Sequence, residues 1–133
     1  MSDPFVIPGP DEYMQAAFGP DGYLATAFPG YKLRHGQLML ARAVDDAVTF
    51  YEHGFFEGGC GIGKSYANLI PATYYTSETH GKVIVATANI ALSEQYHYKD
   101  LPNLQKILPW SFTFGLLKGR NNYICLHRFK ENE

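Results

Sequence analysis

The chain has 133 residues, of which 46% are hydrophobic and 15% aromatic, so it is long enough to form the core of one domain. Its net charge of −2 shows no overall basic excess, which argues only weakly against nucleic-acid binding because a local stripe of Lys and Arg suffices for that function. No apolar run approaches the roughly 20 residues of a membrane helix, the N-terminus lacks the pattern of a secretory signal, and the two cysteines are far apart, so we expect a cytoplasmic protein with no membrane partner.

The first part of the chain is predicted to be an N-terminal arm over residues 1–17, extended over 1–10, followed by helices. In chain order, the other predicted elements are a short helix over 11–18, a second short helix after residue 22, a turn over 28–30 and a longer helix over 37–52. The last of these is predicted because its apolar residues recur at helical spacing on one face.

A glycine-rich loop follows a short strand predicted over 55–57. Its residues fit G-x-x-x-x-G-K-[ST] at every fixed position; they are Gly58, Gly59, Cys60, Gly61, Ile62, Gly63, Lys64 and Ser65. Glycines let backbone N–H groups surround phosphates, Lys64 would reach the β- and γ-phosphate oxygens, and Ser65 would ligate Mg²⁺. A helix starting there would add the positive end of its dipole. The pattern predicts binding of ATP with Mg²⁺, the alternative being a turn that only connects a strand to a helix.

The rest of the chain is predicted to alternate between helices and strands. The predicted elements are a helix from Lys64 to about Tyr75 that Pro71 kinks or shortens, a turn over 80–81, a strand over 83–86, a helix over 89–98, a turn over 100–102, a helical turn over 103–108, a strand over 112–117 and a C-terminal helix from Tyr123. The apolar, β-branched run over 83–86 is typical of a parallel strand buried on both faces. This alternation predicts an α/β fold with a mostly parallel sheet flanked by helices.

Several blocks stand in the order and spacing of a known family. They are FGPDGYLA from residue 18, PGYKLRHGQ from 29, MLARAV from 39, EGGCGIGKS from 57, VIVATANIALSEQ from 83, KDLP from 99 and LKGRNNYIC from 117. On these blocks the chain, from about residue 18 to 128, resembles the DinG/XPD-like iron–sulfur helicases of superfamily 2, which are ATP-dependent DNA helicases. The resemblance implies that residues 18–133 are the N-terminal part of a RecA-like helicase domain 1, a P-loop NTPase fold, ending before the acidic Walker B-type motif.

The resemblance also implies roles for residues outside the loop. Arg34 and Gln37 correspond to an adenine-side motif and join the ATP-binding set. Cys125 corresponds to the first ligand of the iron–sulfur cluster that the full family carries. The block over 83–95 corresponds to one that contacts the DNA strand. Its implied DNA-contacting residues are Thr87, Asn89 and Gln95.

The chain departs from the family at positions that matter for catalysis. Cys60 and Ile62 stand where the family favours Thr, and Cys125 is the only candidate cluster ligand, so no cluster is expected in this chain alone. No apolar strand ending in Asp-Glu follows Ser65, and no second motor domain brings an arginine finger. We therefore expect the ATP-binding segment of a helicase acting on single-stranded DNA, inactive alone, whose partner is the missing helicase half, another protein or a second copy.

Other interpretations stay open at this point. The chain can instead be a small stand-alone nucleotide-binding or protein-interaction module derived from a helicase, without hydrolysis. A P-loop kinase is a weaker alternative, because no acceptor site or lid arginines are found. Cys60 is either a reactive thiol or, more often, a small residue that fits a tight turn. The five histidines show no metal-ligand spacing, and the basic cluster over 118–130 is either a DNA contact or a solvated face.

Overall fold

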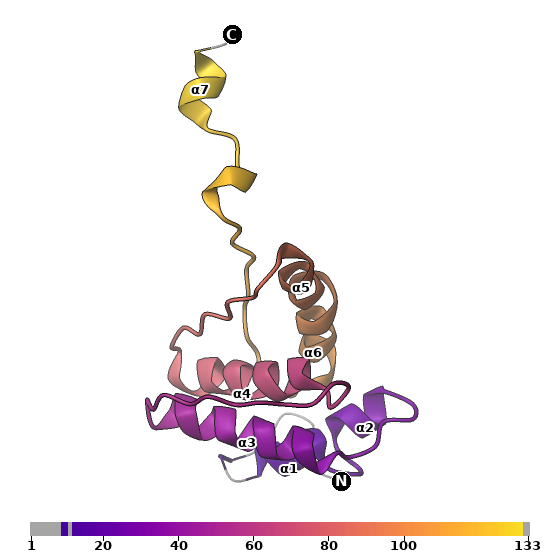
Figure 1. Cartoon of the computed structure of the whole chain (residues 1–133). Helices are drawn as coiled ribbons and strands as arrows, with labels where there is room; N and C mark the ends of the chain where they lie inside the picture. The colour runs from indigo at the N-terminus through magenta and orange to yellow at the C-terminus, as the bar shows by residue number, and fades with distance from the viewer. Residues whose placement is uncertain (1–8, 11, 132–133) are drawn as a thin grey trace.

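The regular structure of the protein is helical in all the residues that can be described. The computed structural model describes residues 9–10 and 12–131. Its elements are α1 (Tyr13–Phe18), α2 (Tyr23–Ala27), α3 (His35–Thr49), α4 (Lys64–Thr79), α5 (Ile90–Gln95), the π-helix η1 (Tyr96–Asp100), α6 (Leu101–Ile107), the 3₁₀-helix η2 (Arg120–Asn122) and α7 (Leu126–Lys130) (Figure 1). Within these ranges no helix is both long and apolar enough to cross a lipid bilayer.

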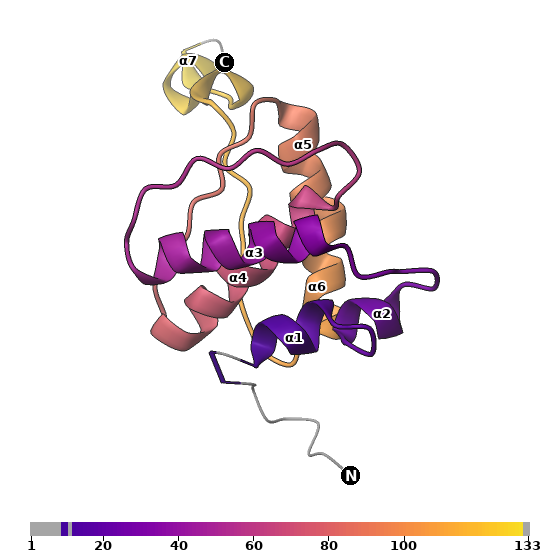
Figure 2. The ribbon, with the colours of Figure 1, turned by 60° about the horizontal axis from the view of Figure 1, so that its bottom comes forward.

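The core lies where α1, α2 and α6 meet the pair formed by α3 and α4 (Figures 1 and 2). Its buried apolar side chains are Tyr13, Met14, Ala17, Phe18, Leu24, Ala41, Ala67, Leu69, Ile70, Tyr74, Leu104, Leu108, Trp110 and Phe112. The predicted helices α1, α2 and α3 are confirmed with small shifts of their ends. The arm predicted over 1–10 lies outside the described residues apart from residues 9 and 10, whereas α1 is packed in the core.

One buried polar contact fixes α1 on α3. Tyr13 Oη donates to Asp45 Oδ1 at 2.5 Å, and the Tyr13 ring stacks on Tyr74 with ring centroids 3.8 Å apart. Burial and the hydrogen bond to the carboxylate raise the pKa of Tyr13. Burial also raises the pKa of Asp45, although the Tyr13 hydrogen bond acts in the opposite direction. The fold therefore holds the neutral phenol of Tyr13.

Helix α4 is longer than predicted, because Pro71 does not end it. The helix continues four residues past Tyr75, to Thr79. Pro71 removes one backbone hydrogen bond, to the carbonyl of Ala67. The cost is offset by packing, since Pro71 is itself buried, as are its neighbours Ile70 and Ala72. Tertiary burial therefore overrides the local preference of proline.

The chain also stays helical through Pro102, where a turn was predicted. Elements α5, η1 and α6 follow one another without a break from residue 90 to 107. Pro102 is the second residue of α6 and directly follows the π-helix η1, where the regular i to i−4 hydrogen-bond pattern is already interrupted. At the other end, Asn89 caps α5 by accepting the Leu92 N–H at 2.9 Å. The helix predicted over 89–98 is confirmed, but the turn over 100–102 is wrong.

The predicted mostly parallel sheet is wrong. The segments 55–57, 83–86 and 112–117 are not strands in this structure, and no strand occurs among the residues it describes. A strand exists only when a neighbour accepts and donates its backbone hydrogen bonds, and these three segments do not pair. Their apolar side chains are not buried between layers either: Phe55 is 97% exposed, Ile84 92% and Leu117 89%. The α/β, RecA-like class is therefore replaced by a helical body with long extended connections.

The last residues leave this body. After Phe114 the chain runs outward, and η2 and α7 lie on an arm that projects away from the other helices (Figure 1). The base of the arm is tied to α5, because Lys118 Nζ pairs with Glu94 Oε1 at 2.6 Å. The predicted C-terminal helix is shorter than expected, since α7 begins at Leu126 and not at Tyr123.

Candidate phosphate-binding site

The glycine-rich loop immediately precedes α4 and lies beside the start of α3. The connection after Thr49 runs back along α3 before α4 begins (Figure 1). Two loop residues, Gly61 and Gly63, have φ of +77° and +86°, in the left-handed region that favours glycine. Gly63 is the residue before α4 and accepts the Ala67 N–H at 3.2 Å. The glycines of the motif therefore serve the turn that starts the helix.

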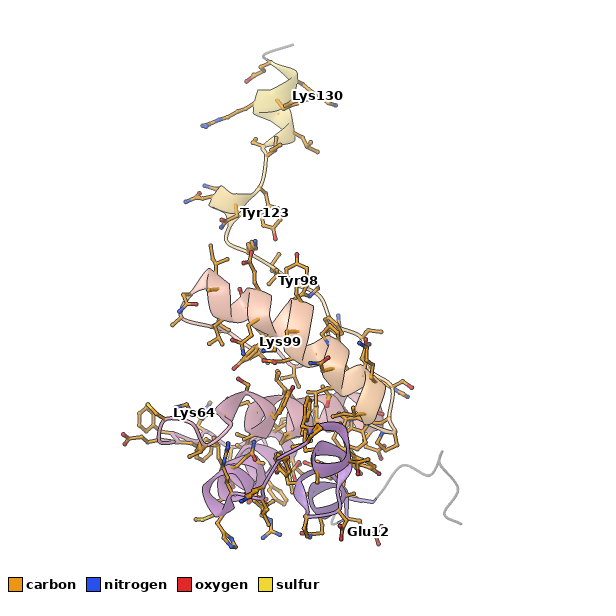
Figure 3. All side chains as sticks on the ribbon, turned by 90° about the vertical axis from the view of Figure 1, so that its right-hand side faces the viewer. Glu12, Lys64, Tyr98, Lys99, Tyr123 and Lys130 are labelled. Atoms are coloured by element: carbon orange, nitrogen blue, oxygen red, sulfur yellow. The ribbon has the colours of Figure 1, made fainter. Side chains whose placement is uncertain are left out.

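Lys64 points its ammonium group at the loop itself. Its Nζ donates to the carbonyl oxygens of Gly58 at 2.8 Å and Gly59 at 3.3 Å. The side chain is exposed and lies at an edge of the helical body, well away from Tyr123 and Lys130 on the projecting arm (Figure 3). Because an ammonium group has three N–H donors and water can reach it, these contacts can be exchanged for an anion.

Arg34 and Gln37 lie beside the same loop, although each is more than 20 residues away in the sequence. Arg34 Nη1 donates to the Gly61 carbonyl at 2.8 Å, and Gln37 Nε2 donates to the Gly63 carbonyl at 3.0 Å. Arg34 is exposed, whereas Gln37 is only 2% exposed. Arg34 is the residue before α3 and Gln37 lies in its first turn, so this end of α3 holds the loop from one side.

Tyr31 is the residue of this site that sequence reasoning missed. Its hydroxyl donates to Gln37 Oε1 at 3.2 Å and reaches the Phe18 carbonyl at the same distance. Tyr31 stands in the same sequence block as Arg34 and Gln37, but no spacing rule singles it out. The contact is visible only once the turn before α3 is folded.

The other predicted ligands lie apart or have local partners. Ser65 is the second residue of α4 and is partly exposed, so its assignment to Mg²⁺ stays a prediction. Cys60 in the loop and Cys125 on the arm are both free and exposed. Among the described residues no group of three or more His, Cys, Asp or Glu side chains is placed to hold a metal ion.

The three predicted DNA-contacting residues gather around α5, not around the loop. Thr87 Oγ1 donates to the Asn89 carbonyl at 2.9 Å, and the Asn89 side chain caps α5. Gln95 Nε2 donates to the buried carboxylate of Asp100 at 2.9 Å. Their side chains therefore already shape the start and end of α5, and their contact with DNA stays a prediction.

The comparisons with known proteins point to one class. The 3'-5' exonuclease DinG of Bacillus subtilis is 38% identical over 113 residues, which are 85% of this chain and 12% of that protein. The ATP-dependent DNA helicase YoaA of Escherichia coli is 42% identical over 114 residues, 86% of this chain and 17% of the relative. The ATP-dependent helicase DinG of Mycobacterium tuberculosis is 41% identical over 109 residues, 79% and 16% respectively. No protein-family model and no solved structure matches the chain.

The chain is thus related to ATP-dependent helicases. More narrowly, it is a DinG-like sequence, similar to DinG and YoaA proteins over most of its own length. It spans only about 12 to 17% of the length of these relatives.

Proposed function

We propose that residues 58–65 bind the phosphates of ATP or ADP together with Mg²⁺, and that this chain is the nucleotide-binding segment of a DinG-like ATP-dependent DNA helicase. Three features that lie together support this proposal most. They are a loop whose glycines adopt left-handed backbone angles, the exposed side chain of Lys64 and the start of the 16-residue helix α4. Such a helix start offers free N–H groups and a positive partial charge to an anion.

Binding would proceed by exchange at Lys64. The ammonium group would leave the carbonyls of Gly58 and Gly59 for phosphate oxygens, which carry a full charge and accept stronger hydrogen bonds than a neutral carbonyl. The two carbonyls are on an exposed loop, so water can replace the lost donor. Ser65, one residue further along α4, would add its hydroxyl to the Mg²⁺ shell.

Hydrolysis is not part of the proposal for this chain alone. Phosphoryl transfer needs Mg²⁺ to be held, water to be positioned and the developing charge to be neutralised. After Ser65 the sequence has no apolar segment ending in Asp-Glu, and Asp100 is buried and engaged by Gln95. We therefore propose nucleotide binding without turnover, with single-stranded DNA as a weak ligand at most.

The test is a calorimetric titration of Mg-ATP into the wild-type chain and Lys64→Ala. Losing a hydrogen-bonded partner of a charged group costs about 1.5–3 kcal/mol, so we expect Lys64→Ala to weaken binding roughly 10- to 150-fold. Lys82→Ala is the matched control, because it removes the same charge beyond the far end of α4, about 24 Å from the loop. Lys82→Ala should bind like the wild type. Equal affinity in the wild type and Lys64→Ala would contradict the proposal.

A protein-interaction module is a second candidate function, and one observation favours it. The three extended segments carry large apolar side chains in solvent, with Phe55, Ile84 and Leu117 each about nine-tenths exposed or more. Exposed apolar surface and unpaired backbone favour association with another chain. Light scattering after size exclusion tests this: a mass above that of one chain supports an interaction role, and a strict monomer at all concentrations argues against self-association.

A further inference from the structure

The amide of Gln37 is committed at both ends. Gln37 Nε2 donates to the Gly63 carbonyl, and Gln37 Oε1 accepts from the Tyr31 hydroxyl, whose one proton it shares with the Phe18 carbonyl. The direction of the amide is fixed by chemistry, because a backbone carbonyl can only accept and the nitrogen must therefore face Gly63. With 2% of its surface exposed, Gln37 is buried in this position. Gln37 is thus a link from Tyr31 to the phosphate loop.

This link acts on the peptide group that begins α4. In a trans peptide the C=O and the following N–H lie in one plane and point in opposite directions. The Gly63 carbonyl accepts from both Ala67 N in α4 and Gln37 Nε2, and with the carbonyl held in this direction the N–H of Lys64 points the opposite way, away from Gln37. Arg34 has the same effect two residues earlier in the loop. It donates to the Gly61 carbonyl and so orients the N–H of Ile62. These are N–H groups of the loop that the proposed function assigns to phosphate.

We propose that Gln37, held by Tyr31, is a positioning residue for the phosphate loop, and that it contributes to nucleotide affinity through the phosphates. The inference rests on the proposed function. The family resemblance assigns Gln37 to the adenine side, and the present contacts give its amide a second task that does not involve the base. Gln37 packs directly on Gly63: an added Cβ at Gly63 would overlap Gln37 Nε2 and lie 3.0 Å from its Cδ.

A ligand without a base separates the two tasks. Mg-tripolyphosphate presents the phosphates of ATP and no adenine, so its affinity reports on the loop alone. Titrations of Mg-ATP and Mg-tripolyphosphate would be compared for the wild type, Gln37→Leu and Tyr31→Phe. Gln37→Leu keeps the approximate volume and removes both hydrogen bonds. Tyr31→Phe removes one hydroxyl and keeps the ring, so it tests the link where Gln37→Leu fails to fold.

The control is Gln105→Leu. Gln105 Nε2 donates to the Phe112 carbonyl at 2.8 Å, the same kind of amide-to-carbonyl bond, at a place remote from the loop in sequence. Because Gln105 is exposed and Gln37 is buried, Gln105→Leu controls for the loss of an amide-to-carbonyl bond and not for burial, and it should leave both affinities unchanged. Equal affinity losses in Gln37→Leu and Gln105→Leu would show that the effect is not specific to the phosphate loop.

We expect Gln37→Leu to lose roughly 3- to 10-fold in affinity, by the same factor for both ligands, and Tyr31→Phe to lose less in the same sense. Loss of ATP affinity with unchanged tripolyphosphate affinity would overturn the inference in favour of base recognition. Unchanged affinity for both ligands would overturn it as well. If the wild type binds neither ligand, the proposed function fails, an outcome that is distinct from both of these.

Discussion

Replacing Gly63 with alanine tests the packing of Gln37 against the loop. Two costs add at this position. An alanine with φ of +86° is in the left-handed region, which costs an L-residue about 1–2 kcal/mol. The new Cβ would also displace the Gln37 amide from the Gly63 carbonyl, and a buried polar group without its partner costs about 1–3 kcal/mol. The free energy of unfolding should therefore fall by about 2–5 kcal/mol.

Gly61→Ala separates these two costs. Gly61 has nearly the same φ, +77°, but an added Cβ there would meet nothing within 4 Å. Its variant should lose only the backbone part, about 1–2 kcal/mol. Urea unfolding followed by circular dichroism measures both values, and parallel slopes would show that the same surface is exposed. Equal losses in Gly61→Ala and Gly63→Ala would refute the packing of Gln37 against Gly63.

Three further predictions concern pH, DNA and metal content. Burial raises the pKa of Tyr13 in the folded state above its unfolded value near 10, so the stability that the neutral phenol contributes should be retained below pH 10 and lost as the pH rises further. In chemical denaturation, Tyr13→Phe should lose less stability at alkaline pH than the wild type. Identical pH profiles would contradict the buried phenol. Single-stranded DNA binding, measured by fluorescence anisotropy, should be weak with a shallow salt dependence, a few multiples of about −0.7 in log K against log salt, whereas tight, salt-insensitive binding would point to another surface. Protein purified without oxygen should show no iron–sulfur absorbance, because Cys125 is the only candidate ligand on the arm; a brown protein would contradict this unless several chains share a cluster.

The helices of the first half were predictable because their signals are local. Apolar spacing in α3 and glycine or proline at the ends of α1 and α2 act over a few residues, and the structure moves their limits only slightly. Pro71 and Pro102 were misjudged for different reasons. Pro71 is kept inside α4 by its burial, and Pro102 directly follows a π-helix, where the regular hydrogen-bond pattern is already interrupted.

The sheet could not be settled by local pattern. An apolar, β-branched run such as 83–86 indicates extended backbone, but pairing depends on whether two other segments come within hydrogen-bonding distance. Here Ile84 faces solvent, so the same pattern gives an extended connection. The sequence pattern therefore indicated the extended backbone conformation of 83–86, but it did not indicate whether another segment pairs with it.

For the candidate site too, the sequence predicted some features and only the structure shows the others. Residues 58–65 follow from a motif whose spacing has a chemical reason, and Arg34 and Gln37 follow from the family resemblance. The structure adds where their side chains lie. The hold of Lys64 on Gly58 and the bond from Tyr31 to Gln37 join atoms that no spacing rule connects.

The most direct test of nucleotide binding at this loop is a backbone amide NMR titration of the ¹⁵N-labelled chain with Mg-ADP. We expect the largest shifts for the amides of 58–65, above all Ile62 and Lys64, with smaller shifts at Arg34 and Gln37. Shifts confined to another region, such as 87–95, or no shifts at saturating nucleotide, would contradict it.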